Sequence, residues 1–62
     1  MDETIQRLSE ALRRARDAKP NLPLGLMMEN AVLRANSAFY IISDEDCVEA
    51  LENYATYLEI ES

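Results

Sequence analysis

Histidine and tryptophan are absent from this sequence of 62 residues, and cysteine occurs once, at Cys47. A single cysteine cannot form a disulfide within the chain, and without histidine there is no Ser-His or Cys-His catalytic pair and no Cys/His zinc site. One glycine and two prolines are too few for an all-β fold with many tight turns. The unpaired cysteine is typical of a reducing compartment, so we expect a cytoplasmic protein.

Long hydrophobic runs are also missing. The most apolar stretch, residues 22–42, falls short of the roughly 20 predominantly apolar residues of a membrane span, because it is interrupted by Glu29, Asn30, Arg34, Asn36 and Ser37. The first residues are acidic and polar, unlike the basic and then apolar start of a signal peptide. The sequence therefore predicts a soluble protein with no membrane partner.

Hydrophobic residues make up 48% of the chain and charged residues 29%, which is the composition of a globular protein. A chain of about 60 residues buries only about 60% of the surface that it exposes when unfolded, so its own core gives marginal stability. We expect residues 1–62 to form one small helical domain.

Apolar residues recur at helical spacing in three segments. The first predicted helix covers residues 3–18, where Ile5, Leu8, Leu12 and Ala15 share one face, and it ends before Pro20. The second covers residues 23–42, with Pro23 in its first turn. The third covers residues 44–59, with Ser43 as its N-cap and three acids in its first turn.

The second segment is apolar around more than half of its circumference, which is too much for one neighbouring helix to cover. It is therefore predicted to be the central helix. Its link to the third helix is only Ile42 and Ser43, which leaves both a tight reversal and a right-angled corner open.

These patterns predict an all-α fold, a three-helix hairpin or bundle assembled as a homo-oligomer, most simply a two-fold dimer. Small residues at spacings of four and three form a strip on the second segment that suits close helix packing, within the chain or between copies. The predicted oligomer interface comprises Met27, Met28, Ala31, Ala35, Ala38 and Phe39.

Charge is distributed unevenly along the chain. Residues 1–19 carry five cations and four acids, whereas residues 20–62 carry Arg34 as their only cation and eight acids. Four of these acids follow helical spacing along the third helix, with no cation in that segment: Glu45, Glu49, Glu52 and Glu59. This acidic ridge is interpreted either as a solubilising face, which could also pair with arginines of the first helix across a subunit contact, or as the binding surface for a basic protein partner.

The arginines of the first helix are interleaved with acids at i,i+4 spacing, as in Glu3–Arg7, Glu10–Arg14 and Arg13–Asp17. Such pairs stabilise a helix surface and leave one surplus positive charge, so the pattern does not favour direct nucleic-acid binding. The alternative is that arginines from several subunits, Arg13, Arg14 or Arg16, converge in the grooves between subunits on a small anionic ligand such as a nucleotide.

Carboxylates alone do not predict an enzyme here, because general acid–base catalysis needs a buried carboxyl in a cleft and three short helices offer little room for one. The run Asp44-Glu45-Asp46 lacks the ligand spacing of a calcium loop, and we expect no metal and no cofactor. The sequence favours a small acidic interaction module that acts as a regulatory factor, inhibitor or antagonist. The alternative is an oligomeric binder of a small anion, and direct DNA binding is a third class.

Overall fold

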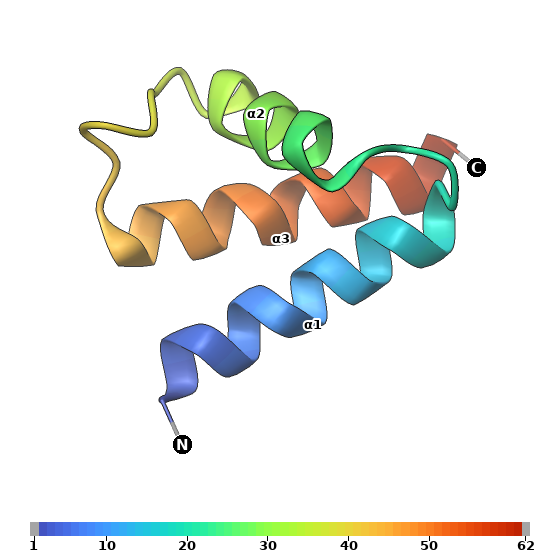
Figure 1. The fold of residues 1–62 in the computed structure, drawn as a ribbon, viewed down its shortest axis with the longest axis horizontal. Helices are drawn as coiled ribbons and strands as arrows, with labels where there is room; N and C mark the ends of the chain where they lie inside the picture. Colours follow the sequence, from blue (N-terminus) through green and yellow to red (C-terminus); the bar gives the residue numbers. More distant parts are fainter. Residues whose placement is uncertain (1, 62) are drawn as a thin grey trace.

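The computed structural model describes residues 2–61 and shows three α-helices (Figure 1): α1 (Glu3–Ala18), α2 (Leu24–Arg34) and α3 (Asp44–Glu61). Residues 2–61 contain no strand, and the all-α, three-helix fold predicted from the sequence is confirmed. The predicted limits of the first helix also agree with the structure.

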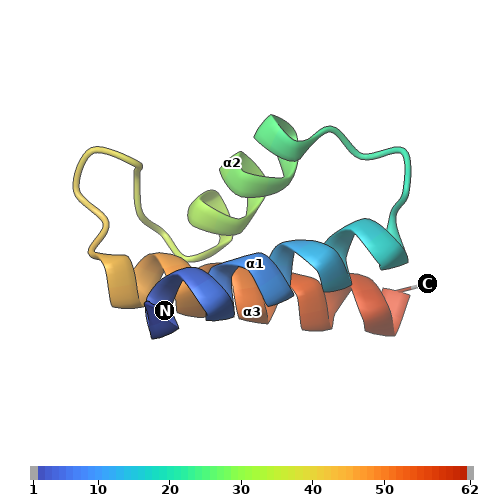
Figure 2. The same cartoon turned by 60° about the horizontal axis from the view of Figure 1, so that its bottom comes forward.

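The three helices form an open arrangement with α3 at its base. Helices α1 and α3 run in the same direction, and α2, which lies between them in the sequence, runs in the opposite direction (Figure 1). Figure 2 shows α1 beside α3, with α2 raised above this pair. Both α1 and α2 pack mainly on α3 and hardly touch each other. The central helix is therefore α3, which corrects the prediction that the second helix is central.

The core is built on one face of α3, which contributes six of the eleven buried hydrophobic residues. Alanines let α1 approach closely, since Ala11 and Ala15 are at most 1% exposed and lie in the same cluster as Ala55. The larger side chains of the core are supplied by α2 and α3, where Met27 and Leu51 are fully buried.

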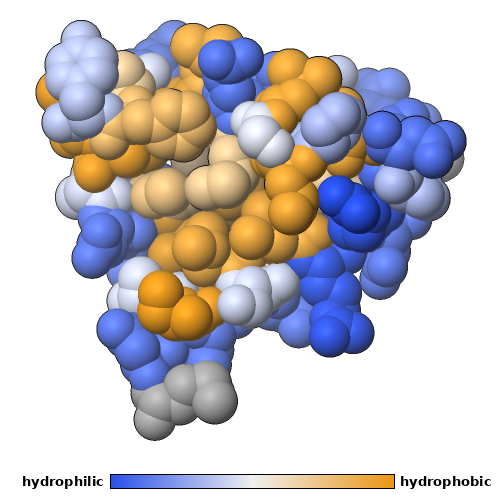
Figure 3. All heavy atoms as spheres, in the orientation of Figure 1, coloured by the Kyte–Doolittle hydropathy of each residue, from blue (hydrophilic) through white to orange (hydrophobic). Residues whose placement is uncertain are grey.

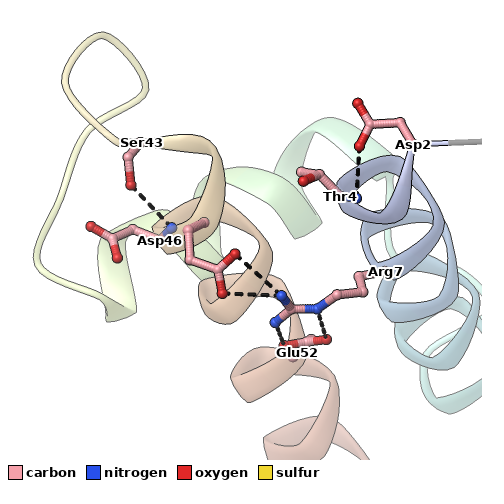
Figure 4. Close-up of polar contacts among 7 residues, drawn as sticks. Asp2, Thr4, Arg7, Ser43, Asp46 and Glu52 are labelled. Carbon is pink, nitrogen blue, oxygen red and sulfur yellow. Dashed lines mark hydrogen bonds and ion pairs between the residues drawn. The ribbon is translucent and has the colours of Figure 1, made fainter.

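Side-chain caps define the N-termini of two helices (Figure 4). The backbone N–H of Thr4 donates to Asp2 Oδ1 over 2.9 Å at the start of α1, and the N–H of Asp46 donates to Ser43 Oγ over 3.1 Å at the start of α3. The predicted cap at Ser43 is confirmed. Helix α3 continues to Glu61, two residues beyond its predicted end.

Helix α2 ends at Arg34 rather than at residue 42, which corrects the predicted range 23–42. Asn36 adopts a left-handed backbone with φ 56°. The N–H of Ser37 donates to the carbonyl oxygen of Val32 and that of Asn36 to the carbonyl oxygen of Leu33. These two bonds form a Schellman motif with asparagine in the position that glycine usually takes. Residues 35–43 are consequently a loop, and the connection to α3 is much longer than predicted.

Within residues 2–61, none of the helices combines the length and the apolar composition needed to cross a bilayer.

Candidate interaction surfaces

The acidic ridge of α3 is partly neutralised by α1. The guanidinium of Arg7 lies between two ridge carboxylates (Figure 4), with Nε and Nη2 donating to Glu52 over 3.1 and 2.8 Å and Nη1 donating to Glu45 over 3.0 Å. Arg14 repeats this arrangement two turns later, where it binds both carboxylate oxygens of Glu59. Three of the four predicted partner-binding carboxylates are thus engaged inside the chain.

The two arginine clamps follow from the parallel orientation of α1 and α3. Arg7 and Glu52 are 45 residues apart in sequence, and so are Arg14 and Glu59. A seven-residue step on both helices preserves the register because seven residues are close to two helical turns. Arg14 also donates to Thr56 Oγ1, which fills the gap in the ridge between these acids.

These contacts overturn the ion pairs expected within α1. Among residues 2–61, the ion pairs join α1 to α3, and none forms between Glu3 and Arg7, Glu10 and Arg14, or Arg13 and Asp17. Bidentate arginine–carboxylate contacts are geometrically specific and stronger than single exposed pairs, so the inter-helix pairs are preferred. The spacing of charges along the first helix alone cannot show this, because the competing acids are 38 or 45 residues away in the sequence.

The clamps shift the acidity of the carboxyl groups that they bind. Hydrogen bonds from Arg7 lower the pKa of Glu52, against a smaller opposing effect of desolvation. Hydrogen bonds from Arg14 lower the pKa of Glu59 in the same way. The pKa values of both arginines are raised by these partners. Both carboxylates therefore stay ionised in mildly acidic solution.

Glu49, the fourth residue of the acidic ridge, faces a different environment. It is exposed, takes part in no ion pair among residues 2–61, and lines a hollow of about 440 Å³ between α3 and the end of α2. We call this the acidic hollow. Its polar and apolar lining includes Asn36, Ser37, Ile42, Asp46, Glu49 and Asn53.

The residues predicted for an oligomer interface do not form one surface. Met27 and Ala31 are buried inside the chain, and Met28 and Ala38 are half-buried. Because α2 ends at Arg34, the side chains of Ala35, Ala38 and Phe39 do not continue the helical strip of Ala31. The predicted interface is therefore not one continuous helical strip, and its buried members Met27 and Ala31 belong to the core of one chain.

Large apolar side chains are nevertheless exposed in the loop between α2 and α3. Phe39, Tyr40 and Ile41 are 54%, 89% and 67% exposed, and Phe39 and Tyr40 line a shallow hollow against Leu33 of α2. The sequence pattern placed these residues inside a helix. Asn36 was the available signal, since asparagine is the residue that most readily replaces glycine at a helix C-terminus.

Within one chain, the three arginines proposed for an anion site lie at different places. Arg14 is bound to Glu59 on α3, whereas Arg13 and Arg16 line a hollow with Leu12 and Leu24 on the side that faces α2. Arg13 and Arg16 form no ion pair with any acid among residues 2–61. Arg13 and Arg16 are therefore two cations beside an apolar surface, and Arg14 does not join them in a cluster.

Aromatic and amide contacts fix α2 against α3. The guanidinium of Arg34 lies 4.2 Å from the centre of the Tyr57 ring, and Asn30 Nδ2 donates to the hydroxyl of Tyr54 over 3.1 Å. A cation over an aromatic face is worth about 0.5–1 kcal/mol at an exposed site. These contacts account for Arg34, the only cation after residue 19.

Within residues 2–61, no three His, Cys, Asp or Glu side chains are grouped so that they could hold a metal ion. Cys47 is a free, half-buried thiol that packs on the core. Comparison with known proteins gives no match to a family model, to a curated protein or to a solved structure.

Proposed function

We propose that the protein is an acidic helical interaction module that acts as a regulatory factor or inhibitor by binding a basic segment of another protein. The carrying observation is the acidic hollow, in which Asp46 and Glu49 lie beside the end of α2 and form no ion pair with a cation of residues 2–61. A lysine or arginine side chain of the partner fits this chemistry. Of the acidic ridge, Glu49 is then the residue that binds the partner, whereas Glu45, Glu52 and Glu59 bind arginines of α1 within the chain.

The surroundings of the hollow favour a positive ligand. Residues 35–61 contain seven acids and no lysine or arginine. Three of these acids are held by Arg7 and Arg14, whereas Asp46 and Glu49 in the hollow have no ion-pair partner in the described part of the chain, residues 2–61. The C-terminal end of α2 lies at the same place, and a helix C-terminus also attracts cations.

Apolar side chains near the hollow can extend the contact. Ile42 lines the hollow itself, and the preceding residues Tyr40 and Ile41 are exposed. A basic segment that also carries apolar residues would bury these side chains while its cation enters the hollow. Interfaces of this composition combine an apolar centre with charged groups that steer association.

Charge reversal inside and outside the hollow tests this function. The tagged wild-type chain, the double variant Asp46→Lys/Glu49→Lys and the control Glu10→Lys are used to capture proteins from an extract of the source cells. Glu10 is an exposed acid of α1 that lies outside the acidic hollow. We expect a protein that is retained by wild type and by the control, released by salt, and lost with the double variant.

Retention of the same proteins by all three chains would contradict the proposal, and so would wild type that retains none. A captured protein counts as support only when a basic peptide from it binds the purified wild-type chain. Circular dichroism of each variant verifies that the charge reversals leave the helices intact.

The anion-binding alternative is less well supported by the geometry. It uses Arg13, Arg14 or Arg16 in grooves between subunits, and of these Arg14 is already held by Glu59 and Thr56 within one chain. A nucleotide that binds only the folded chain would raise its melting temperature. Such an increase, abolished by Arg13→Gln/Arg16→Gln, would favour the alternative over the acidic hollow.

A further inference from the structure

We propose that the apolar trough along α1 is a homodimer interface, in which a second copy of the chain packs with its α1 antiparallel to the first. The trough consists of two hollows along α1. One lies between Ile5 and Leu8 of α1 and Cys47 and Val48 of α3, and the other lies between Leu12 of α1 and Leu24 of α2. It is distinct from the acidic hollow, which lies between α3 and the end of α2.

The trough exists because α1 and α2 both pack on α3 but hardly touch each other. In Figure 3 apolar side chains gather over the middle of the face between these two helices. Ile5 and Leu24 are 53% and 51% exposed, whereas Leu8 and Leu12 are half-buried and pack against the core. A single copy of the chain therefore leaves apolar side chains of α1 and α2 in contact with water.

The two ends of the trough carry opposite charges. At the N-terminal end of α1, Asp2 and Asp44 border the hollow that contains Ile5 and Leu8. At the other end, Arg13 and Arg16 border the hollow that contains Leu12 and Leu24. Among residues 2–61, none of these four charged residues forms an ion pair.

This pattern is self-complementary. A two-fold axis that lies in the interface, perpendicular to α1, places the acidic end of one copy against the basic end of the other, and it does so twice. The same operation brings Ile5 of one copy towards Leu12 of its partner, with Leu8 near the axis. A uniformly basic partner would be repelled by the arginines and a uniformly acidic one by the aspartates, so a second copy is the occupant that the charges favour.

Two charge-reversed variants test this geometry. The first is Arg13→Glu/Arg16→Glu, and the second is Asp44→Lys, which leaves the cap at Asp2 intact. Each variant alone brings like charges together at both ends of its own dimer, and we expect self-association to weaken roughly a hundredfold or more. An equimolar mixture restores opposite charges at both ends, so native mass spectrometry should show the heterodimer.

Three controls complete the experiment. Leu12→Glu places a charge inside the trough and should give a monomer. Glu49→Lys changes the acidic hollow and should leave the dimer intact, so failure of the proposed function and failure of this inference are distinguishable. Circular dichroism verifies helicity, and if a charge-reversed variant loses it, Arg16→Gln and Asp44→Asn take its place and each should weaken the wild-type dimer.

A wild-type chain that remains monomeric would overturn the inference. So would folded variants that dimerise as well as wild type, or a mixture of folded, monomeric variants that gives no heterodimer. A dimer that survives Leu12→Glu would show that the copies meet at another surface.

Discussion

Asn36, the left-handed residue that follows α2, gives the sharpest test of the fold. If α2 ends at Arg34, substitutions at Asn36 change the stability of the chain in one direction, and if the helix continues to residue 42 they change it in the other. In the structure Asn36 has φ 56° and its N–H caps the carbonyl oxygen of Leu33. Glycine adopts this conformation without strain, whereas a left-handed backbone costs roughly 1–2 kcal/mol for most L-residues and less for asparagine.

These values give an order of stability. Asn36→Gly should be as stable as wild type or more so, and Asn36→Ala should lose about 1 kcal/mol, most of the difference between alanine and asparagine in a left-handed backbone. If α2 instead continued to residue 42, alanine would be the better residue at a helix interior by about 0.5 kcal/mol and glycine the worst. The two structures therefore predict opposite signs for the same pair of variants.

Urea unfolding followed by circular dichroism measures this difference. A loss of about 1 kcal/mol lowers the midpoint by about 1 M urea for a chain of this size, since the slope is close to 1 kcal/mol per M. The native helical signal of Asn36→Ala should not rise. If Asn36→Ala is more stable and more helical than wild type, the Schellman end at Arg34 and the loop that forms one wall of the acidic hollow are both refuted.

Two further predictions concern the clamps and the core. Because Glu52 and Glu59 have lowered pKa values, their stabilising contribution is present above the ordinary carboxyl pKa of 4.5 and is lost as pH falls below it. As the pH falls through this range, the melting temperature of wild type should therefore fall more steeply than that of the variant Arg7→Gln/Arg14→Gln. Parallel melting curves of the two chains against pH would contradict the clamps. Leu51 is fully buried, so Leu51→Ala should cost about 2–5 kcal/mol in urea unfolding. The matched variant Ile60→Ala, at a 78% exposed position, should stay within about 0.5 kcal/mol, and equal losses would show that the core is placed wrongly.

Local signals predicted the helices well where caps and helix breakers agreed with the apolar pattern. The first helix begins after the cap at Asp2 and ends before Pro20, and the third begins after the cap at Ser43. The second helix was predicted too long because alanines and apolar residues continue the helical spacing beyond Arg34. A single asparagine in a left-handed conformation ends the helix there, and its preference is weaker than that of glycine.

The prediction of the candidate sites was limited by a lack of information about tertiary contacts. The acidic ridge was recognised from helical spacing, but the pairing of Arg7 with Glu45 and Glu52 depends on the parallel register of α1 and α3. The excess apolar surface was also recognised, but it was assigned to the second helix. Leu24, Leu26 and Leu33 of α2 are exposed, in agreement with this prediction, but Ile5 of α1 and residues 39–41 of the loop that follows α2 are exposed as well.

The central claim is that one copy of this chain leaves an apolar trough that a second copy covers. Sedimentation equilibrium of the wild-type chain over the micromolar range tests it most directly. The account predicts a mass that rises with concentration from 7.1 kDa towards twice that value, with no larger species. A folded chain that sediments at 7.1 kDa throughout the range would contradict it.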